Sequence, residues 1–247
     1  MFEAYSTSHL VVLGVFVAGV VVLLAIGPVV RGRPAERTVA VALAAGNIAF
    51  GLAGTLTELV PFDAQGSLPL QVCDFAWVVV AWALLTRHRF ALALTYYWGL
   101  TLSLQAMVQP TLDDAFPDPN FFAFWGKHVL LVWGAVYATL TLRQGPDWRG
   151  YRQAVAATFA WVAVVMCLNP LLDSNYGYFN GKPSDGTVLD YLGPWPWYVL
   201  AEVVIVLVGW ALITLPWAGW PRPRARIVRG GVTPHPSRDR YEWWPRP

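Results

Sequence analysis

The chain has 247 residues, of which 56% are hydrophobic and only 13% are charged. A soluble domain usually carries about 25% charged residues, so this composition excludes an ordinary water-soluble fold and indicates a protein dissolved in a lipid bilayer. The formal net charge of +2 says little by itself, because the charged residues are segregated along the chain.

Seven apolar stretches follow one another along the chain. A hydrocarbon core about 30 Å thick needs roughly 20 apolar residues at a helical rise of about 1.5 Å each. The stretches that meet this requirement are residues 9–30, 38–60, 68–85, 90–109, 121–142, 153–172 and 195–217. Because lipid satisfies no backbone hydrogen bonds, we predict an all-α polytopic membrane protein built as a bundle of seven transmembrane helices.

The arginines predict how this bundle is oriented. All fifteen lie in the first, third and fifth connections or after the last span, and seven spans place every one of them on the same side. The two lysines, Lys127 and Lys182, lie toward the opposite side. The positive-inside rule then predicts an outer N-terminus, a cytoplasmic C-terminus and a multi-pass location in the inner (plasma) membrane.

Two regions of different composition are expected. Residues 1–220 form the transmembrane domain, and residues 221–247 form a basic, Pro-rich cytoplasmic tail that is expected to be disordered. The tail either contacts anionic lipid headgroups or simply flanks the last span as a stop-transfer segment. Since a membrane flank explains the arginines, no nucleic-acid partner is expected, and no protein partner is assigned.

Polar residues within the predicted spans gather at one depth. Each is costly in lipid and is therefore a functional candidate. With seven spans, the outer third of the membrane holds Glu58, Gln71, Cys73, Asp74, Gln105, Gln109, Lys127, His128, Asn169, Asp173 and Glu202. The segment after the sixth span adds Asn175, Tyr176, Lys182 and Asp190. We expect an outward-facing polar cavity, in which Gln71, Asp74, Gln105, Gln109, Asn169, Asn175, Tyr176, Lys182, Asp190 and Glu202 bind substrate.

Cys73 and His128 are the expected catalytic pair. An imidazole that removes the proton of a neighbouring thiol creates a nucleophilic thiolate, and Asp74 or another carboxylate could orient that imidazole. Structural alternatives stay open, since a free cysteine is often a small buried hydrophobe and Lys127 can extend to the outer headgroups. Glu202 could equally hydrogen-bond a neighbouring helix. No cofactor and no metal ion is expected.

Several motifs resemble those of the YwaF-like integral membrane proteins. Residues 68–74 read LPLQVCD and are similar to the motif LPLHxCD, while Trp98-Gly99 and the SLQA of residues 103–106 resemble WGxxxSLQA. Asn175-Tyr176 with Lys182-Pro183 matches NY…KP, and residues 189–198, LDYLGPWPWY, closely resemble LDxLGPWPWY. The resemblance covers about residues 45–217. Gln71 departs from the pattern, because the family has a histidine there.

The resemblance implies a function. The family is similar to an animal transmembrane acyltransferase that remodels ether phospholipids, and its proposed catalytic cysteine and histidine fall on Cys73 and His128. Wider relatives include lipid-ester hydrolases that use a Thr–His pair in a helical bundle. We therefore expect an acyltransferase or lipid-ester hydrolase with membrane lipids as substrate. The alternatives are a transporter or flippase, and a non-catalytic membrane subunit of a cell-envelope complex.

Overall fold

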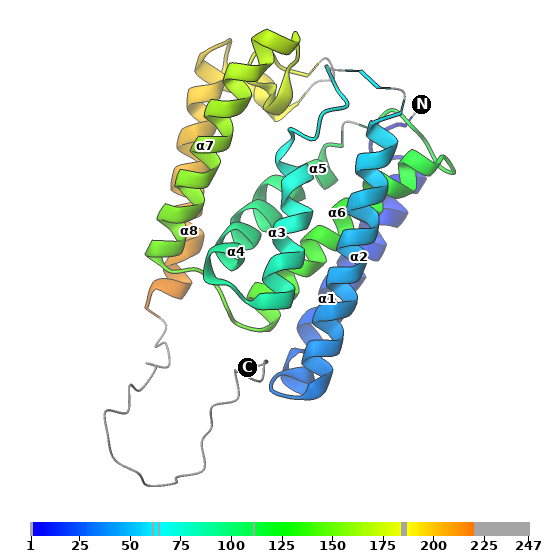
Figure 1. The fold of residues 1–247 in the computed structure, drawn as a ribbon, viewed down its shortest axis with the longest axis vertical. Coiled ribbons are helices and arrows are strands. Elements are labelled where there is room, and N and C mark those ends of the chain that lie inside the picture. The colour runs from blue at the N-terminus through cyan, green and yellow to red at the C-terminus, as the bar shows by residue number, and fades with distance from the viewer. Residues whose placement is uncertain (1, 61, 64, 111, 184–186, 220–247) are drawn as a thin grey trace, which may run out of the picture.

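A computed structural model describes residues 2–60, 62–63, 65–110, 112–183 and 187–219, and within them all regular secondary structure is helical (Figure 1). The longer helices are α1 (Thr7–Val30), α2 (Pro34–Glu58), α3 (Val72–Thr86), α6 (Pro119–Ala135), α7 (Trp148–Leu172) and α8 (Trp197–Ala218). A continuous run joins α4 (Arg89–Leu94), the π-helical η1 (Thr95–Leu102) and α5 (Ser103–Val108), and the π-helical η2 (Val136–Thr141) continues α6. Two short 3-10 helices, η3 (Tyr176–Tyr178) and η4 (Val188–Leu192), precede α8. The predicted tail, residues 221–247, lies outside the described residues.

Five of these helical segments are long and apolar enough to cross a membrane: Thr7–Val30, Pro34–Glu58, Pro119–Thr141, Trp148–Leu172 and Trp197–Ala218. The other two predicted spans correspond to the run from α4 to α5 and to α3. With 15 residues, α3 is about 22 Å long, which is shorter than the hydrocarbon core.

The prediction placed the start of α3 at residue 68, four residues too early. The backbone N–H of Gln71 donates to the Asp74 carboxylate at 2.9 Å, and Gln71 itself has an extended conformation. This side-chain acceptor caps the first turn, so the helix begins at Val72. The apolar sequence of residues 68–70 misled the prediction, because hydropathy does not record where a cap lies.

α2 packs closely between α3 and α6, and two glycines permit the approach. A Cβ atom at Gly51 would lie 2.3 Å from the Trp77 ring of α3. A Cβ atom at Gly126 of α6 would lie 2.0 Å from the ring of Phe50. Small residues at such interfaces let membrane helices associate through van der Waals contact, so α2, α3 and α6 form one rigid block.

One end of the molecule gathers the arginine-rich connections. The Arg87 guanidinium at the end of α3 pairs with Glu36 in the first turn of α2. The Tyr137 hydroxyl of η2 donates to the Glu36 carbonyl at 2.8 Å. The first, third and fifth connections therefore meet at the lower end of the view in Figure 1, as the alternation of helices predicts.

α7 and α8 form a separate arm beside this block (Figure 1). At the arginine-rich end η1 holds the arm, because the Tyr96 hydroxyl donates to the Ile213 carbonyl at 2.9 Å and the Tyr97 hydroxyl lies 2.6 Å from Thr214 Oγ1. At the opposite end the arm is held through the loops around η3 and η4. The arm is thus fixed at both ends, and part of its length borders a cavity.

The outward faces of α1 and α8 are apolar. Leu10, Val21, Val204 and Leu212 are each more than half exposed. Apolar side chains that cover whole helix faces in this way need a non-aqueous surrounding, which is the expected behaviour of helices in contact with lipid.

Candidate functional site

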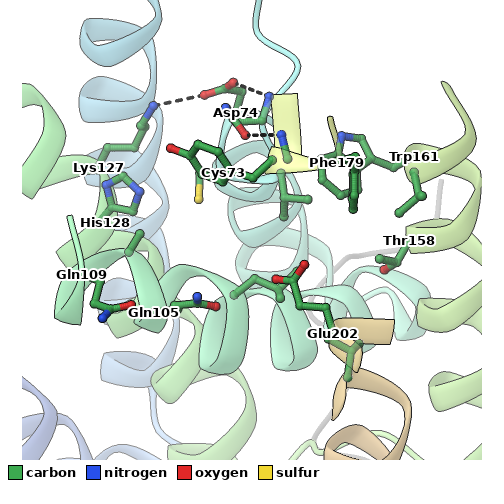
Figure 2. A pocket seen from close by; sticks show the side chains of 18 of the residues that line it. Cys73, Asp74, Gln105, Gln109, Lys127, His128, Thr158, Trp161, Phe179 and Glu202 are labelled. Atoms are coloured by element: carbon green, nitrogen blue, oxygen red, sulfur yellow. Dashed lines mark hydrogen bonds and ion pairs between the residues drawn. The ribbon is translucent and has the colours of Figure 1, made fainter. Parts of the chain in front are cut away.

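A cavity of about 560 Å³ lies between the α7–α8 arm and helices α2, α3, α5 and α6 (Figure 2). Its size is within the range of small-molecule sites. The predicted site residues on its wall are Gln71, Cys73, Asp74, Gln105, Gln109, His128 and Glu202, together with Lys127. Among the described residues, the remaining predicted ones, Asn169, Asn175, Tyr176, Lys182 and Asp190, do not line the cavity and instead hold the loops that cover it.

Cys73 enters the cavity from the first turn of α3. Its Sγ atom lies 3.8 Å from the hydroxyl of Ser103, a fully buried residue at the start of α5. The two side chains come from different helices, so the contact fixes the thiol against the α5 side of the site. Cys167, by contrast, is exposed on the outer face of α7.

His128 reaches the same cavity from α6 and is only 3% exposed. Its Nδ1 atom lies 2.8 Å from the Phe124 carbonyl, and a carbonyl oxygen can only accept, so Nδ1 carries the proton of the neutral ring. Nε2 is then left with a free lone pair. The structure shows no hydrogen bond between His128 and Cys73, both of which lie within its described part.

His9 shows what a fully engaged histidine looks like in this fold. Its Nδ1 accepts from the Tyr5 backbone N–H at 2.9 Å, and its Nε2 lies 2.9 Å from the Met107 carbonyl. Both ring nitrogens therefore serve to attach α1 to the end of α5. His128 differs because only one of its nitrogens is used in this way.

Lys127 is the centre of a buried ion cluster. Its ammonium lies 2.8 Å from Glu58 Oε1 of α2 and 3.1 Å from Asp74 Oδ1 of α3, and the Lys127 and Asp74 side chains are each 3% exposed. Figure 2 shows Lys127 extending toward Asp74 above His128. Lys127 thus points inward rather than extending to the headgroups, and Asp74 binds this ammonium and the cap of α3 rather than the imidazole.

Gln71 links the cavity wall to the covering loop. Its side-chain oxygen accepts from the Gly177 N–H at 3.2 Å, and Gly177 has a φ of 69°, which favours glycine. Nearby, the Leu68 N–H donates to the Tyr176 hydroxyl at 3.0 Å. Gln71 and Tyr176 therefore position the loop that closes the cavity from the side opposite to the arginine-rich end.

Asn169 holds the same loop from the end of α7. This fully buried amide donates to the Tyr176 carbonyl at 3.0 Å, and its oxygen accepts from the Tyr176 N–H at 3.0 Å and from the Ser174 hydroxyl at 3.1 Å. The pairing with both backbone groups of one residue is a structural role, not a cavity contact.

Replacing Asn169 by alanine is expected to lower the free energy of unfolding by about 2 kcal/mol, because buried polar groups of Tyr176 lose their partners. Thermal unfolding of the purified protein in detergent measures this effect. Asn169→Asp places a carboxylate oxygen against the Tyr176 carbonyl and buries a negative charge, so its loss should be at least as large. Equal stability of Asn169→Ala and the parent would contradict the assignment.

The remaining loop residues interact with one another. Asn175 Nδ2 donates to the Gly181 carbonyl at 2.7 Å. Lys182 pairs with Asp190 at 3.5 Å and lies 5.5 Å from the centre of the Tyr198 ring. These contacts connect η3, η4 and the start of α8, so the predicted substrate contacts of this loop are structural ties in the present arrangement.

Glu202 and Gln105 complete the polar part of the cavity wall deeper than Lys127. Figure 2 places Glu202 of α8 and Gln105 of α5 on opposite sides of the cavity. Within the described part of the chain no hydrogen bond or ion pair engages Glu202. Gln109 accepts weakly from the Val188 N–H at 3.5 Å.

Three further residues shape the site without having been predicted as site residues: Ser103, Trp161 and Phe179. Trp161 donates to the Leu70 carbonyl at 2.9 Å and stands beside Phe179, with ring centres 5.6 Å apart. Ser103 belongs to the quoted SLQA motif, which was the available signal. The two aromatic residues look like ordinary core residues in a sequence, so no signal pointed to them.

Apolar helices long enough for a bilayer, packed around a cavity with a partly polar wall, define a helical integral membrane protein with an internal cavity. A sequence model of the TMEM164 family matches residues 4–214, and the chain belongs to this family. No curated protein and no solved structure matches the chain.

Proposed function

We propose that this TMEM164 family protein, a YwaF-like member, is a membrane-embedded acyltransferase or lipid-ester hydrolase that acts on lipid acyl chains through Cys73 and His128. The observation that supports this most is that the thiol and an imidazole with a free Nε2 lone pair, from two different helices, line one cavity. Covalent acyl transfer requires at least a nucleophile and a general base in the same cavity.

The reaction runs in two halves. Nε2 of His128 takes the proton of the Cys73 thiol as Sγ attacks the carbonyl carbon of a lipid ester. The ester C–O bond breaks, the released alkoxide takes the proton from His128, and the acyl group remains on Cys73 as a thioester. An acceptor hydroxyl then gives its proton to His128 and attacks the thioester. The C–S bond breaks, and the released Sγ takes the proton back from His128, which restores the thiol. When water is the acceptor, the same steps give hydrolysis.

The tetrahedral intermediate carries a negative charge that needs donors. The Gln105 side chain lines the cavity, and Gln71 has its oxygen engaged with Gly177, which leaves its amide N–H groups for a ligand. Loss of one such donor typically lowers the rate by about 10²–10³-fold. Asn169, which the sequence predicts to bind substrate, is occupied by the loop and is not assigned this role.

For the topology we propose seven spans with the N-terminus outside, in the plasma membrane. The support is the common location of the arginine-rich connections and the Glu36–Arg87 pair at one end of the bundle. In this orientation the cavity lies near the outer face, in contact with outer-leaflet lipids.

The test is direct detection of the acyl-enzyme. Purified protein is incubated with a phospholipid, quenched in acid, digested and analysed by peptide mass spectrometry. An acyl adduct is expected on Cys73, with Cys167 as the internal control, since both are free thiols and only Cys73 lines the cavity. His128→Ala should lower the occupancy strongly. Labelling of Cys167 alone, or no acylation under turnover, would reject the mechanism. A transporter or a non-catalytic subunit predicts that Cys73 is not acylated.

A further inference from the structure

The cavity has a polar outer part and an apolar inner part. Around the ion cluster the wall carries Glu58, Asp74 and Lys127, and beyond Glu202 it becomes apolar. One face of α8 supplies this inner wall, because Val203, Val206, Leu207 and Trp210 recur at helical spacing. From Val203 to Trp210 this stripe is about 10 Å long. The inner part is therefore elongated along the helix.

The facing walls of the inner part are also apolar. α7 contributes Val155, Phe159 and Val162, and η1 contributes Leu102. Thr158, the polar residue of the α7 face, accepts from Trp98 at 2.8 Å and donates to the Ala154 carbonyl at 2.9 Å, so its hydroxyl is already engaged. An elongated apolar space below a polar vestibule fits one unbranched hydrocarbon chain attached to a polar group.

Trp210 closes the inner end. Its side chain is 1% exposed, its indole N–H donates to Thr101 at 3.0 Å, and its ring stacks on Tyr97 with ring centres 4.7 Å apart. The hydrogen bond and the stacking come from η1 on the opposite side of the cavity, so the indole bridges α8 and η1. A side chain held by both helices forms a rigid floor that a ligand cannot displace at low cost.

We propose that the inner part of the cavity binds a single acyl chain of a membrane lipid and that Trp210 sets the longest chain that fits. This inference rests on the proposed function for the acyl transfer at Cys73. Binding of the acyl chain does not itself require that reaction. Chains that end above Trp210 are buried completely. Longer chains must leave their last carbons outside the apolar space or displace the indole.

The experiment measures binding in the Cys73→Ala background, where no acyl transfer occurs. A series of saturated lysophospholipids, from hexanoyl to docosanoyl, displaces a fluorescent lysophospholipid from the purified full chain. With the parental Trp210, affinity should rise about fourfold for each added methylene group that is buried, and then stop rising at one chain length. Trp210→Ala should move this limit to longer chains by roughly two carbons or more, because the vacated indole space accepts them.

Trp217→Ala is the matched control. Trp217 is on the same helix and also donates to η1, at 3.0 Å to the Tyr96 hydroxyl, but it does not line the cavity. It should leave the limit unchanged. Val206→Phe adds volume above Trp210 and should lower the longest acyl-chain length at which affinity still rises. This second variant keeps the proposal testable if Trp210→Ala folds poorly.

An unchanged limit in both Trp210→Ala and Val206→Phe, or equal affinity for all chain lengths in the parent, would overturn the proposal. A limit that shifts as expected, in a protein whose Cys73 is never acylated, would support the acyl site and reject only the proposed reaction. The two hypotheses therefore fail separately.

Discussion

Cys73→Ala and His128→Ala are each expected to lower acyl exchange between phospholipids by about 10³-fold or more. The first removes the nucleophile and the second removes the base, and each step of the proposed reaction needs both. The measurement is transfer of an isotope-labelled acyl chain by purified protein in mixed micelles, followed by lipid mass spectrometry. Thermal unfolding in the same detergent shows whether each variant is folded.

The double variant gives the sharper result. Residues that act as one unit are strongly non-additive, so Cys73→Ala with His128→Ala should be no slower than either single variant. Cys167→Ala and His88→Ala are the matched controls, since Cys167 is exposed on α7 and His88 stacks on Trp82 between α3 and α4, away from the cavity. Full activity of either site variant, or multiplicative losses in the double variant, would contradict the shared mechanism.

Lys127→Met is expected to destabilise the fold by about 3–5 kcal/mol, the usual result of leaving a buried charge without its partner. The side chain of Asp74 is 3% exposed and would lose its cation, whereas that of Glu58 is 38% exposed and can be solvated. The loss should therefore come mainly from Asp74. Denaturant unfolding of the purified protein measures the change.

A second substitution identifies the cause. In Lys127→Met with Asp74→Asn the buried carboxylate is gone, so much of the lost stability should return. Lys182→Met is the matched control, because its ion pair with Asp190 is 3.5 Å long and partly exposed, and such pairs contribute about 0–1 kcal/mol. A double variant as unstable as Lys127→Met alone would show that the ion cluster is not what stabilises this end of α2, α3 and α6.

The helical class of the fold could be predicted from the sequence because hydropathy and helix length are tied to the thickness of the bilayer. Gathering of the polar residues could also be predicted, since α2, α3, α5, α6 and α8 all present polar groups near the same end. What could not be predicted was which of these polar side chains line the cavity and which hold the covering loop. Side chains such as Asn169 and Tyr176 pair with backbone groups of a loop, and loop geometry leaves little periodic signal.

The ion cluster was missed for a different reason. Lys127, Asp74 and Glu58 are far apart in the chain, and a lysine near the end of a membrane helix looks the same in a sequence whether it extends to the headgroups or turns inward. The choice depends on which carboxylates the packing of α2 and α3 brings within reach, and that packing depends on the close approach at Gly51. Long-range contacts of this kind are decided by three-dimensional geometry.

The cap of α3 has an electrostatic consequence for Cys73. The carboxylate of Asp74 binds the N–H of Gln71, and the Asp74 N–H donates to the Gln71 carbonyl at 3.0 Å, so the cap fixes the N-terminus of α3 next to Cys73. The aligned peptide dipoles of α3 place a partial positive charge of roughly half a proton at this terminus. A thiolate forming at Cys73 would be stabilised by this helical macrodipole, which depends on the backbone and therefore persists under substitution of any single side chain.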